Sequence, residues 1–142
     1  MTWATITAAV DTLVATLSGM VLSPVVLRVS DAPFRADGVG PNGGHFWIEY
    51  PEIIAEPFDG RRVEHIEARG LLTFCWTLLP DPATRRGEAM DRADAIRTKL
   101  ANETTAATDL RCNPGGFTCT TTADGALVFV EIPFTLTGDH AI

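Results

Sequence analysis

Near the amino terminus, apolar residues recur at intervals of three or four positions. They are Ile6, Ala9, Val10, Leu13, Val14 and Leu17. This spacing places them on one face of a helix, which we expect from about Thr5 to Ser18. Gly19 follows, and glycine is the residue that most often ends a helix in the left-handed conformation. The stretch from Val21 to Ser30 is rich in β-branched residues and predicts a strand.

A second apolar stripe at helical spacing lies in the middle of the chain. Its members are Ala89, Ala93, Ile96 and Leu100. The stripe predicts a helix from about Thr84 to Glu103, and Pro82 just before it suits a first helical turn. Because alanine is frequent in the stripe, this helix can lie close against a sheet.

Between the helices, two strand-like runs flank Asp59-Gly60, a dipeptide that favours a two-residue hairpin turn. Folding the chain at this turn places Ile48 opposite Leu71. One face of the ribbon then carries Trp47, Ile53, Ile66, Leu72, Phe74, Trp76 and Leu78. Gly70 indicates a bulge or bend in the long second strand.

The distal half of this hairpin differs in composition from its base. Residues 52–67 carry several charged side chains, and Pro51 and Pro57 confine the first run to a sheet edge or to irregular structure. We expect the base of the hairpin to join the sheet and its tip to project from the body. A projecting tip is either a contact between subunits or a flexible surface loop.

The last third of the chain predicts a second hairpin, with its turn at Asp124-Gly125 and Cys119 opposite Val130. Pro133 in its second strand predicts an open edge or a bulge. The order of elements predicts one α+β domain over residues 1–142. Its mixed or antiparallel sheet carries two packed helices and a projecting β-hairpin.

Composition narrows the classes of function. The chain is 46% hydrophobic, enough for a folded core, and its formal net charge of −7 with no run of Lys or Arg makes nucleic-acid binding unexpected. Asp11, Gly19 and Pro24 interrupt the apolar amino-terminal stretch, so we expect neither a signal peptide nor a membrane span.

The three cysteines, Cys75, Cys112 and Cys119, have no regular spacing. They indicate free, mostly buried thiols in a reducing compartment; pairing of Cys112 with Cys119 is the alternative for a secreted protein. His45 and His65 lack a second histidine or cysteine at the short spacing of a metal site, as does His140.

The long loop from Asp31 to Gly44 contains Gly38 to Gly43, which matches the G-x-G-x-x-G pattern of dinucleotide sites. Such a site needs a helix directly afterwards, whereas residues 45–50 alternate like a strand, and Pro41 removes a backbone N–H. Glutamates on the hairpin predict a solvated charged edge, with a divalent cation at a subunit contact as the alternative. We therefore expect no catalytic, cofactor or metal site.

Three segments of the chain resemble phage tail terminator proteins, the tail-terminator-like and head–tail neck proteins of long-tailed phages. They are the helix Ile6–Leu17 leading into the strand Val25–Val29, the segment Gly70–Pro80 running into the helix Gly87–Glu103, and the closing strand Val128–Phe134. The resemblance implies a structural, non-catalytic protein of the virion, present in the host cytoplasm during assembly. Such a protein caps the tail tube as a ring, usually a hexamer, ends tube growth and forms the junction with the head connector.

The implied partners are copies of the chain itself, the tail tube protein and the head-side connector, and the implied alternative is another head–tail neck protein. The resemblance assigns no functional residues, so the candidate contacts come from the loop and the hairpin tip. They are Arg35, Asp37, Asn42, Phe58, Asp59, Arg61 and Arg62. A small hydrolase that uses Cys112 or His65 is the rival from another class, and a ligand-binding domain with an apolar cavity is the third.

Overall fold

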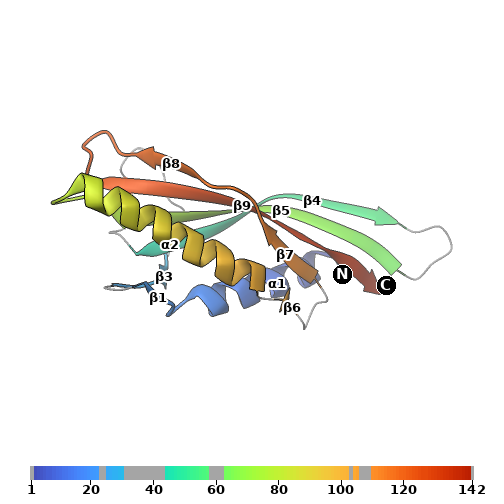
Figure 1. The fold of residues 1–142 in the computed structure, drawn as a ribbon. Helices are drawn as coiled ribbons and strands as arrows, with labels where there is room; N and C mark the ends of the chain where they lie inside the picture. The colour runs from blue at the N-terminus through green and yellow to red at the C-terminus, as the bar shows by residue number, and fades with distance from the viewer. Residues whose placement is uncertain are drawn as a thin grey trace.

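The computed structural model describes residues 2–22, 25–30, 44–57, 63–102, 104–105 and 110–141. Within these ranges it has two helices, α1 (Thr2–Leu17) and α2 (Pro82–Asn102), and a seven-stranded sheet. The expected α+β class is confirmed, and both helices are close to their predicted bounds. Figure 1 shows how the helices and the long strands are arranged.

The seven-stranded sheet is mixed. Its strands follow the order β3 (Arg28–Val29), β4 (His45–Pro57), β5 (Val63–Thr77), β9 (Leu127–Ala141), β7 (Leu110–Pro114) and β6 (Thr104–Thr105), and β8 (Thr118–Thr121) also pairs with β9. β3 runs parallel to β4, and the other pairs are antiparallel. β9 is therefore a central strand, with β5 on one side and β7 and β8 on the other.

The prediction of a single strand from Val21 to Ser30 is wrong. β1 (Val21–Leu22) and β2 (Val25–Val26) pair with each other, and only β3 joins the main sheet. The cause is the turn after α1, where Gly19 adopts a positive φ of 86° and donates its N–H to the Leu27 carbonyl. Leu27 in turn donates to Met20, so the chain folds back on itself before it reaches the sheet.

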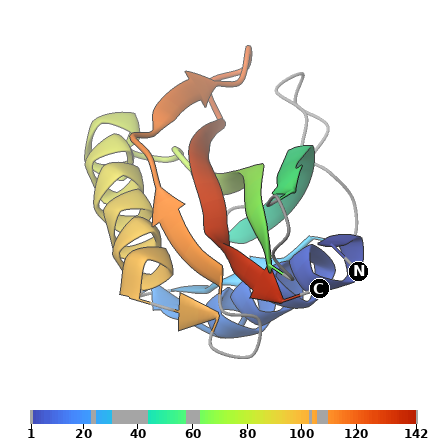
Figure 2. The same cartoon turned by 90° about the vertical axis from the view of Figure 1, so that its right-hand side faces the viewer.

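The core lies between the inner face of the curled sheet and the two helices (Figure 2). Leu72 of β5 and its cross-strand partner Ile132 of β9 are fully buried in it, as are Phe74 and its partner Val130. From α2 it receives the predicted stripe of Ala89, Ala93, Ile96 and Leu100, each at most 1% exposed. The helical periodicity of the sequence thus identified the buried face of α2.

The first hairpin forms as expected, but its register is wrong. Ile48 lies opposite Leu72 rather than Leu71. The distal part of the hairpin pairs two residues away from the predicted register, with Glu56 opposite His65, and the bulge between Glu49 and Glu52 reduces this shift to one residue at Ile48. Phe46 and Ile48 therefore face the core. Trp47, expected on the core face, lies on the opposite face of the sheet and packs against Cys75 and Phe129.

The irregularity predicted at Gly70 occurs in the strand beside it. Glu49 pairs with Leu71 and Glu52 pairs with Arg69, so two positions of β4 stand opposite Gly70 alone. This is a β-bulge in β4, not in β5. Gly70 itself pairs regularly with Phe134, and a Cβ at Gly70 would overlap the Phe134 ring.

Pro133 lies in the central strand β9 rather than in an edge strand, but the irregularity predicted as the alternative does occur beside it. It stands opposite Leu71 of β5. On the other side of β9, pairing with β8 ends at Glu131 and pairing with β7 begins at Phe134. The Pro133 carbonyl accepts the Gly115 N–H at 2.7 Å on that side. Because the N and O of one strand residue point the same way, the missing N–H of Pro133 faces the break between β7 and β8.

Three strands run on past the helices and form an extension that we call the arm (Figure 1). The arm consists of residues 54–57 of β4, 63–67 of β5 and 137–141 of β9, paired in continuous register. The expected projecting hairpin is thus confirmed, and a third strand supports it along one side.

Candidate functional site

All seven candidate contact residues lie outside the described residues. They are Arg35, Asp37 and Asn42 in the predicted loop, and Phe58, Asp59, Arg61 and Arg62 at the hairpin tip. The structure does place the strands that lead to that tip, since β4 ends at Pro57 and β5 begins at Val63. These two strand ends lie at the end of the arm.

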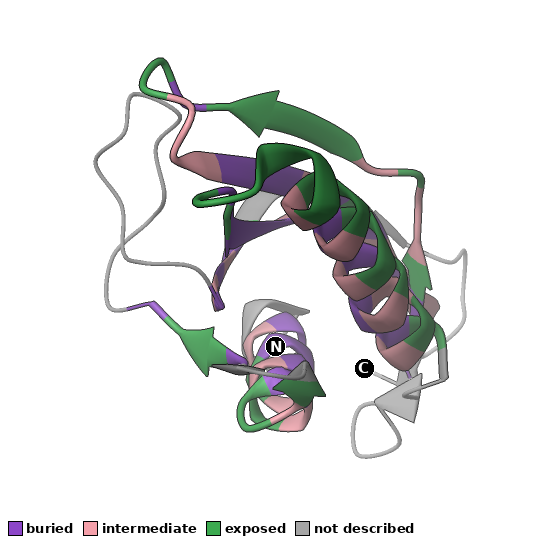
Figure 3. Cartoon of the chain, turned by 60° about the vertical axis from the view of Figure 1, so that its left-hand side comes forward, coloured by how far each residue is buried: buried purple, intermediate pink, exposed green. Residues whose placement is uncertain are grey.

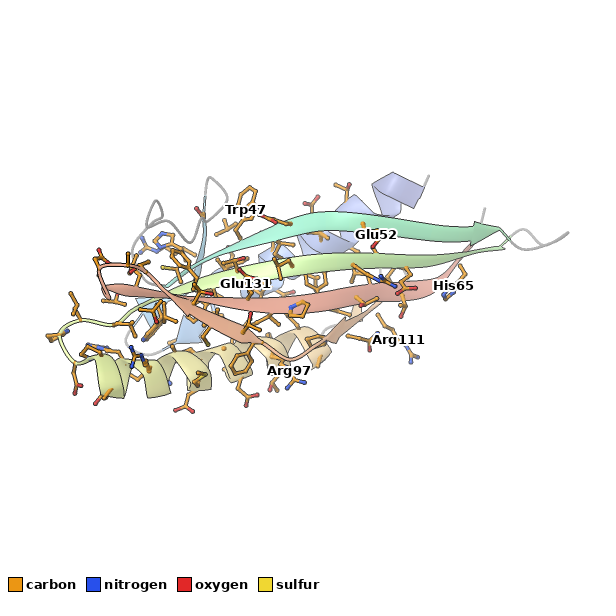
Figure 4. All side chains as sticks on the ribbon, turned by 90° about the horizontal axis from the view of Figure 1, so that it is seen from above. Trp47, Glu52, His65, Arg97, Arg111 and Glu131 are labelled. Atoms are coloured by element: carbon orange, nitrogen blue, oxygen red, sulfur yellow. The ribbon has the colours of Figure 1, made fainter. Side chains whose placement is uncertain are left out.

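The outer face of the sheet, turned away from the core, is polar over much of its length. Figure 4 shows Glu52, Glu131, His65 and Arg111 spread along this face, with Trp47 nearer the other end. Both described helices pack against the inner face of the sheet, so neither of them covers the outer face. The part of this face around Glu52 and Arg69 is exposed, whereas Cys75 and Phe129 beside Trp47 are buried.

One ion-pair cluster is centred on Arg69 of the outer face. Its guanidinium lies 3.3 Å from Glu67 on the same strand and 3.6 Å from Glu52, its cross-strand partner in β4. The Arg69 and Glu52 side chains are each more than half exposed, so water screens the cluster. These pairs stabilise the isolated chain by little and leave charged groups available to a partner.

Two of the three thiols are buried and unreactive. Burial raises the pKa of Cys75 to about 12, and burial raises that of Cys112 to about 12 as well. Both thiols therefore stay protonated near neutral pH, when a nucleophilic cysteine would need to be a thiolate. All three cysteines are free, so the alternative disulfide between Cys112 and Cys119 is absent.

Cys119 departs from the expectation of buried thiols. It lies on β8, is exposed, and its sulfur is 3.7 Å from Met90 Sδ of α2. Partial burial raises its pKa above the ordinary value, so it too is mostly protonated near neutral pH. The contact with Met90 shows that β8 lies beside α2.

Two hollows are lined by described residues; neither includes His65, and the one that includes Cys112 contains no carboxylate. Cys112 lines an open depression between α2 and β7, together with Arg97, Thr98, Ala101, Asn113 and Pro114. An apolar slot over Gly70, which includes Ile6 and Val10 of α1, has about 10 Å³ of space, roughly one water molecule. Neither is the deep site that the hydrolase or ligand-binding alternative requires.

Within the described ranges, no three His, Cys, Asp or Glu side chains gather in a way that could hold a metal ion. Neither described helix combines the length and the apolar character needed to cross a membrane.

Two exposed aspartates have lowered pKa values for local structural reasons. The Thr84 hydroxyl donates to Asp81 at 2.7 Å, and this bond holds the Asp81 pKa below its ordinary value at the start of α2. The Thr122 hydroxyl donates to Asp124 at 2.6 Å and lowers the pKa of that carboxyl in the β8–β9 turn. Both carboxylates organise the backbone around them.

β8 is an exposed surface that the sequence patterns did not predict. All four of its residues are exposed, although they belong to a strand that pairs with the central strand β9. The available signal was the run of threonines from Thr118 to Thr122, which contains neither a charge nor a proline. Such a run is unusual for an open sheet edge.

Fold and surfaces together define an α+β protein with a projecting three-stranded arm and open sheet edges. Comparison with known protein families and with curated proteins finds no match to this chain.

Proposed function

We propose that the chain is a structural protein that assembles with copies of itself, and that its role is that of a tail terminator in a long-tailed phage. In this role it caps the tail tube as a ring, usually of six subunits, ends tube growth and forms the junction with the head connector. The observation that carries the proposal is the arm (Figure 1).

The arm supports assembly because its strands extend beyond the core that stabilises them. In a lone subunit, residues 54–57 of β4 pair only with β5 within the described sheet. An extension of this kind gains a packing partner when it lies against a neighbouring subunit. If each arm contacts a different surface of the next copy, the contacts are head-to-tail, and they form a ring when the rotation between neighbouring copies closes.

The same edge carries features that discourage uncontrolled pairing. Pro51 and Pro57 remove backbone donors from β4, and the bulge after Glu49 interrupts its register. An edge blunted in this way favours one specific neighbour over open-ended sheet extension. The proposal therefore assigns the arm to a defined subunit contact.

Charge supports the proposed place of the ring around a DNA channel. The formal net charge is −7, and an acidic lumen would let DNA slide through without adhering. A basic lumen in the assembled ring would contradict this part of the proposal.

The test is the native mass by light scattering over a range of concentrations, with and without polymerised tail tubes, followed by electron microscopy. We expect a discrete oligomer of about six times the 15.3 kDa subunit, with a central opening, and a stop to tube elongation when it is added. A ring that binds the head connector but does not stop elongation would indicate another neck protein. A chain that stays monomeric even with tubes present would overturn the assembly role.

A further inference from the structure

β8 is an edge strand whose four residues are all exposed, and Cys119 touches Met90 of α2 on one face. Its four residues pair with β9 through Thr118 opposite Glu131 to Thr121 opposite Val128, and no described strand pairs with its other edge. Figure 3 shows β8 as an exposed strand that overhangs α2. A strand in this position presents unpaired N–H and C=O groups to solvent.

The two long edges of the sheet differ in how they are protected. The β4 edge carries Pro51, Pro57 and the acidic residues Glu49 and Glu52. β8 carries only Thr118, Cys119, Thr120 and Thr121, with no charge, proline or bulge. An uncharged, threonine-rich strand can pair with a copy of itself without bringing like charges together. β8 is thus the edge that is suited to self-pairing.

We propose that β8 is the docking edge for a second copy of this chain, whose β8 pairs with it antiparallel about a two-fold axis at Cys119. Residues directly opposite in an antiparallel pair point to the same face, so a two-fold axis perpendicular to the sheet must pass through a residue pair. In this register Cys119 stands opposite the partner's Cys119, and Thr118 stands opposite the partner's Thr120. The two sheets join into one.

The flank of α2 beside β8 matches the same axis. Met90 is 43% exposed and its sulfur touches Cys119, so the axis passes at the level of Met90. Arg97 donates to the Gly115 carbonyl at 2.7 Å; together with the contact of Met90 with Cys119, this shows that α2 runs antiparallel to the segment that contains β8. Arg86 and Asp94 lie one turn to either side of Met90 on this flank.

The two-fold axis reverses the partner's α2 relative to the first. Arg86 then lies level with the partner's Asp94, and Asp94 lies level with the partner's Arg86. Both side chains are exposed, Asp94 to 68%. The flank is therefore complementary in charge to its own antiparallel copy, with the exposed Met90 at the centre. The uncharged strand β8 and the charged flank of α2 are therefore each complementary to their own copy about the same two-fold axis, which passes at the level of Cys119 and Met90.

The contact is small, and this sets its expected strength. A four-residue edge and one helix flank bury less than the about 1,200 Å² of a standard stable interface. We therefore expect a dimer that depends on concentration. The inference goes beyond the proposed ring and does not require it, because the two-fold contact joins two copies whether or not others close a ring.

The decisive experiment exchanges the two charges. Arg86→Glu alone places like charges at both ends of the contact, and so does Asp94→Arg. Each single variant should weaken the dimer about tenfold, as expected for two exposed pairs lost and two repulsions added. The double variant Arg86→Glu/Asp94→Arg restores both pairs and should recover the wild-type dimer. Sedimentation equilibrium measures the dissociation constants, and circular dichroism checks the fold of each variant.

A cross-link reports the register independently. A short bis-maleimide should join two wild-type chains through Cys119, because Cys75 and Cys112 are buried. The Cys119→Ser variant is the matched control and should give no covalent dimer. Full-length chain that stays monomeric at its highest soluble concentration would overturn the proposal and leave β8 to a strand of another protein. A dimer that the single charge variants do not weaken would overturn the α2 alignment.

Failure of this contact can be told apart from failure of the ring. If the chain forms rings, loss of the β8 contact should separate stacked or paired rings into single rings. Loss of the ring contact should instead leave the two-chain species.

Discussion

Phe134 lies across Gly70 in the middle of the sheet, and its ring occupies the space that a side chain at Gly70 would need. The two residues are directly paired on adjacent strands, at the level where β4 bulges. The absence of a side chain at Gly70 thus lets an aromatic ring fill the core beneath α1, whose Ile6 and Val10 line the slot above it.

Replacement of Gly70 by alanine should destabilise the protein by about 2 kcal/mol, because overpacking a tight core costs roughly 1–3 kcal/mol. Urea denaturation measures the change in the free energy of unfolding. Gly87→Ala is the matched control, since nothing lies within 4 Å of a Cβ there and the residue is in α2. That change should stabilise by about 0.5–1 kcal/mol. Equal effects of both changes would contradict the role of the Phe134 ring.

The Asp81 cap should make stability depend on pH in acid. The pKa of Asp81 is lower in the folded chain than its ordinary value, so the ionised carboxylate contributes stability at neutral pH. This contribution is lost as pH falls below the ordinary value and through the folded one. We expect Asp81→Asn to melt at a lower temperature than wild type at pH 7.

The difference between the two melting temperatures should shrink as the pH is lowered below about 4. Asp91→Asn, at an exposed position inside α2, is the control for a charge change without a cap. A melting difference that persists unchanged into strong acid would argue against the ionised cap.

Thiol labelling should distinguish the three cysteines. In folded protein we expect one maleimide adduct, at Cys119, because Cys75 and Cys112 are buried and burial raises the pKa of each to about 12. Denaturant should expose all three thiols to the reagent. Mass spectrometry counts the adducts and locates them by peptide. Rapid labelling of Cys112 in the folded chain would contradict its burial and would support the alternative in which Cys112 is a nucleophile.

The hairpin tip should contribute to assembly through its basic residues. Replacing Arg61 and Arg62 together by glutamate should shift the oligomer towards smaller species and leave the subunit folded. Light scattering gives the mass, and a wild-type thermal transition shows that the fold is kept. Unchanged assembly would remove the hairpin tip from the proposed subunit contact.

Local patterns predicted what depends on neighbours in sequence. The stripe from Ala89 to Leu100 identified the buried face of α2, and Asp124-Gly125 identified a turn in which Gly125 has a positive φ of 71°. The second hairpin also has its predicted pairing of Cys119 with Val130. These features follow from helical periodicity and turn chemistry, which act over a few residues.

Prediction failed where the outcome depended on a distant strand. Trp47 was assigned to the core face, but the register of β4 against β5 turned it outward, and a one-residue change of register exchanges the faces of a strand. Pro133 is tolerated in a central strand because its missing donor faces the break between β7 and β8. Nothing within a few residues of Pro133 reveals that break.

The sequence by itself therefore determined the helices, the principal strands, the α+β class and the core stripe of α2, because periodicity and turn preferences are local. Only the tertiary structure decided the hairpin register, the need for glycine opposite Phe134, and which sheet edges stay open. Those properties arise when segments far apart in the chain pair and pack. The exposed edge at β8 and its alignment with Met90 belong to this second group, since they exist only once α2 and β9 have met in space.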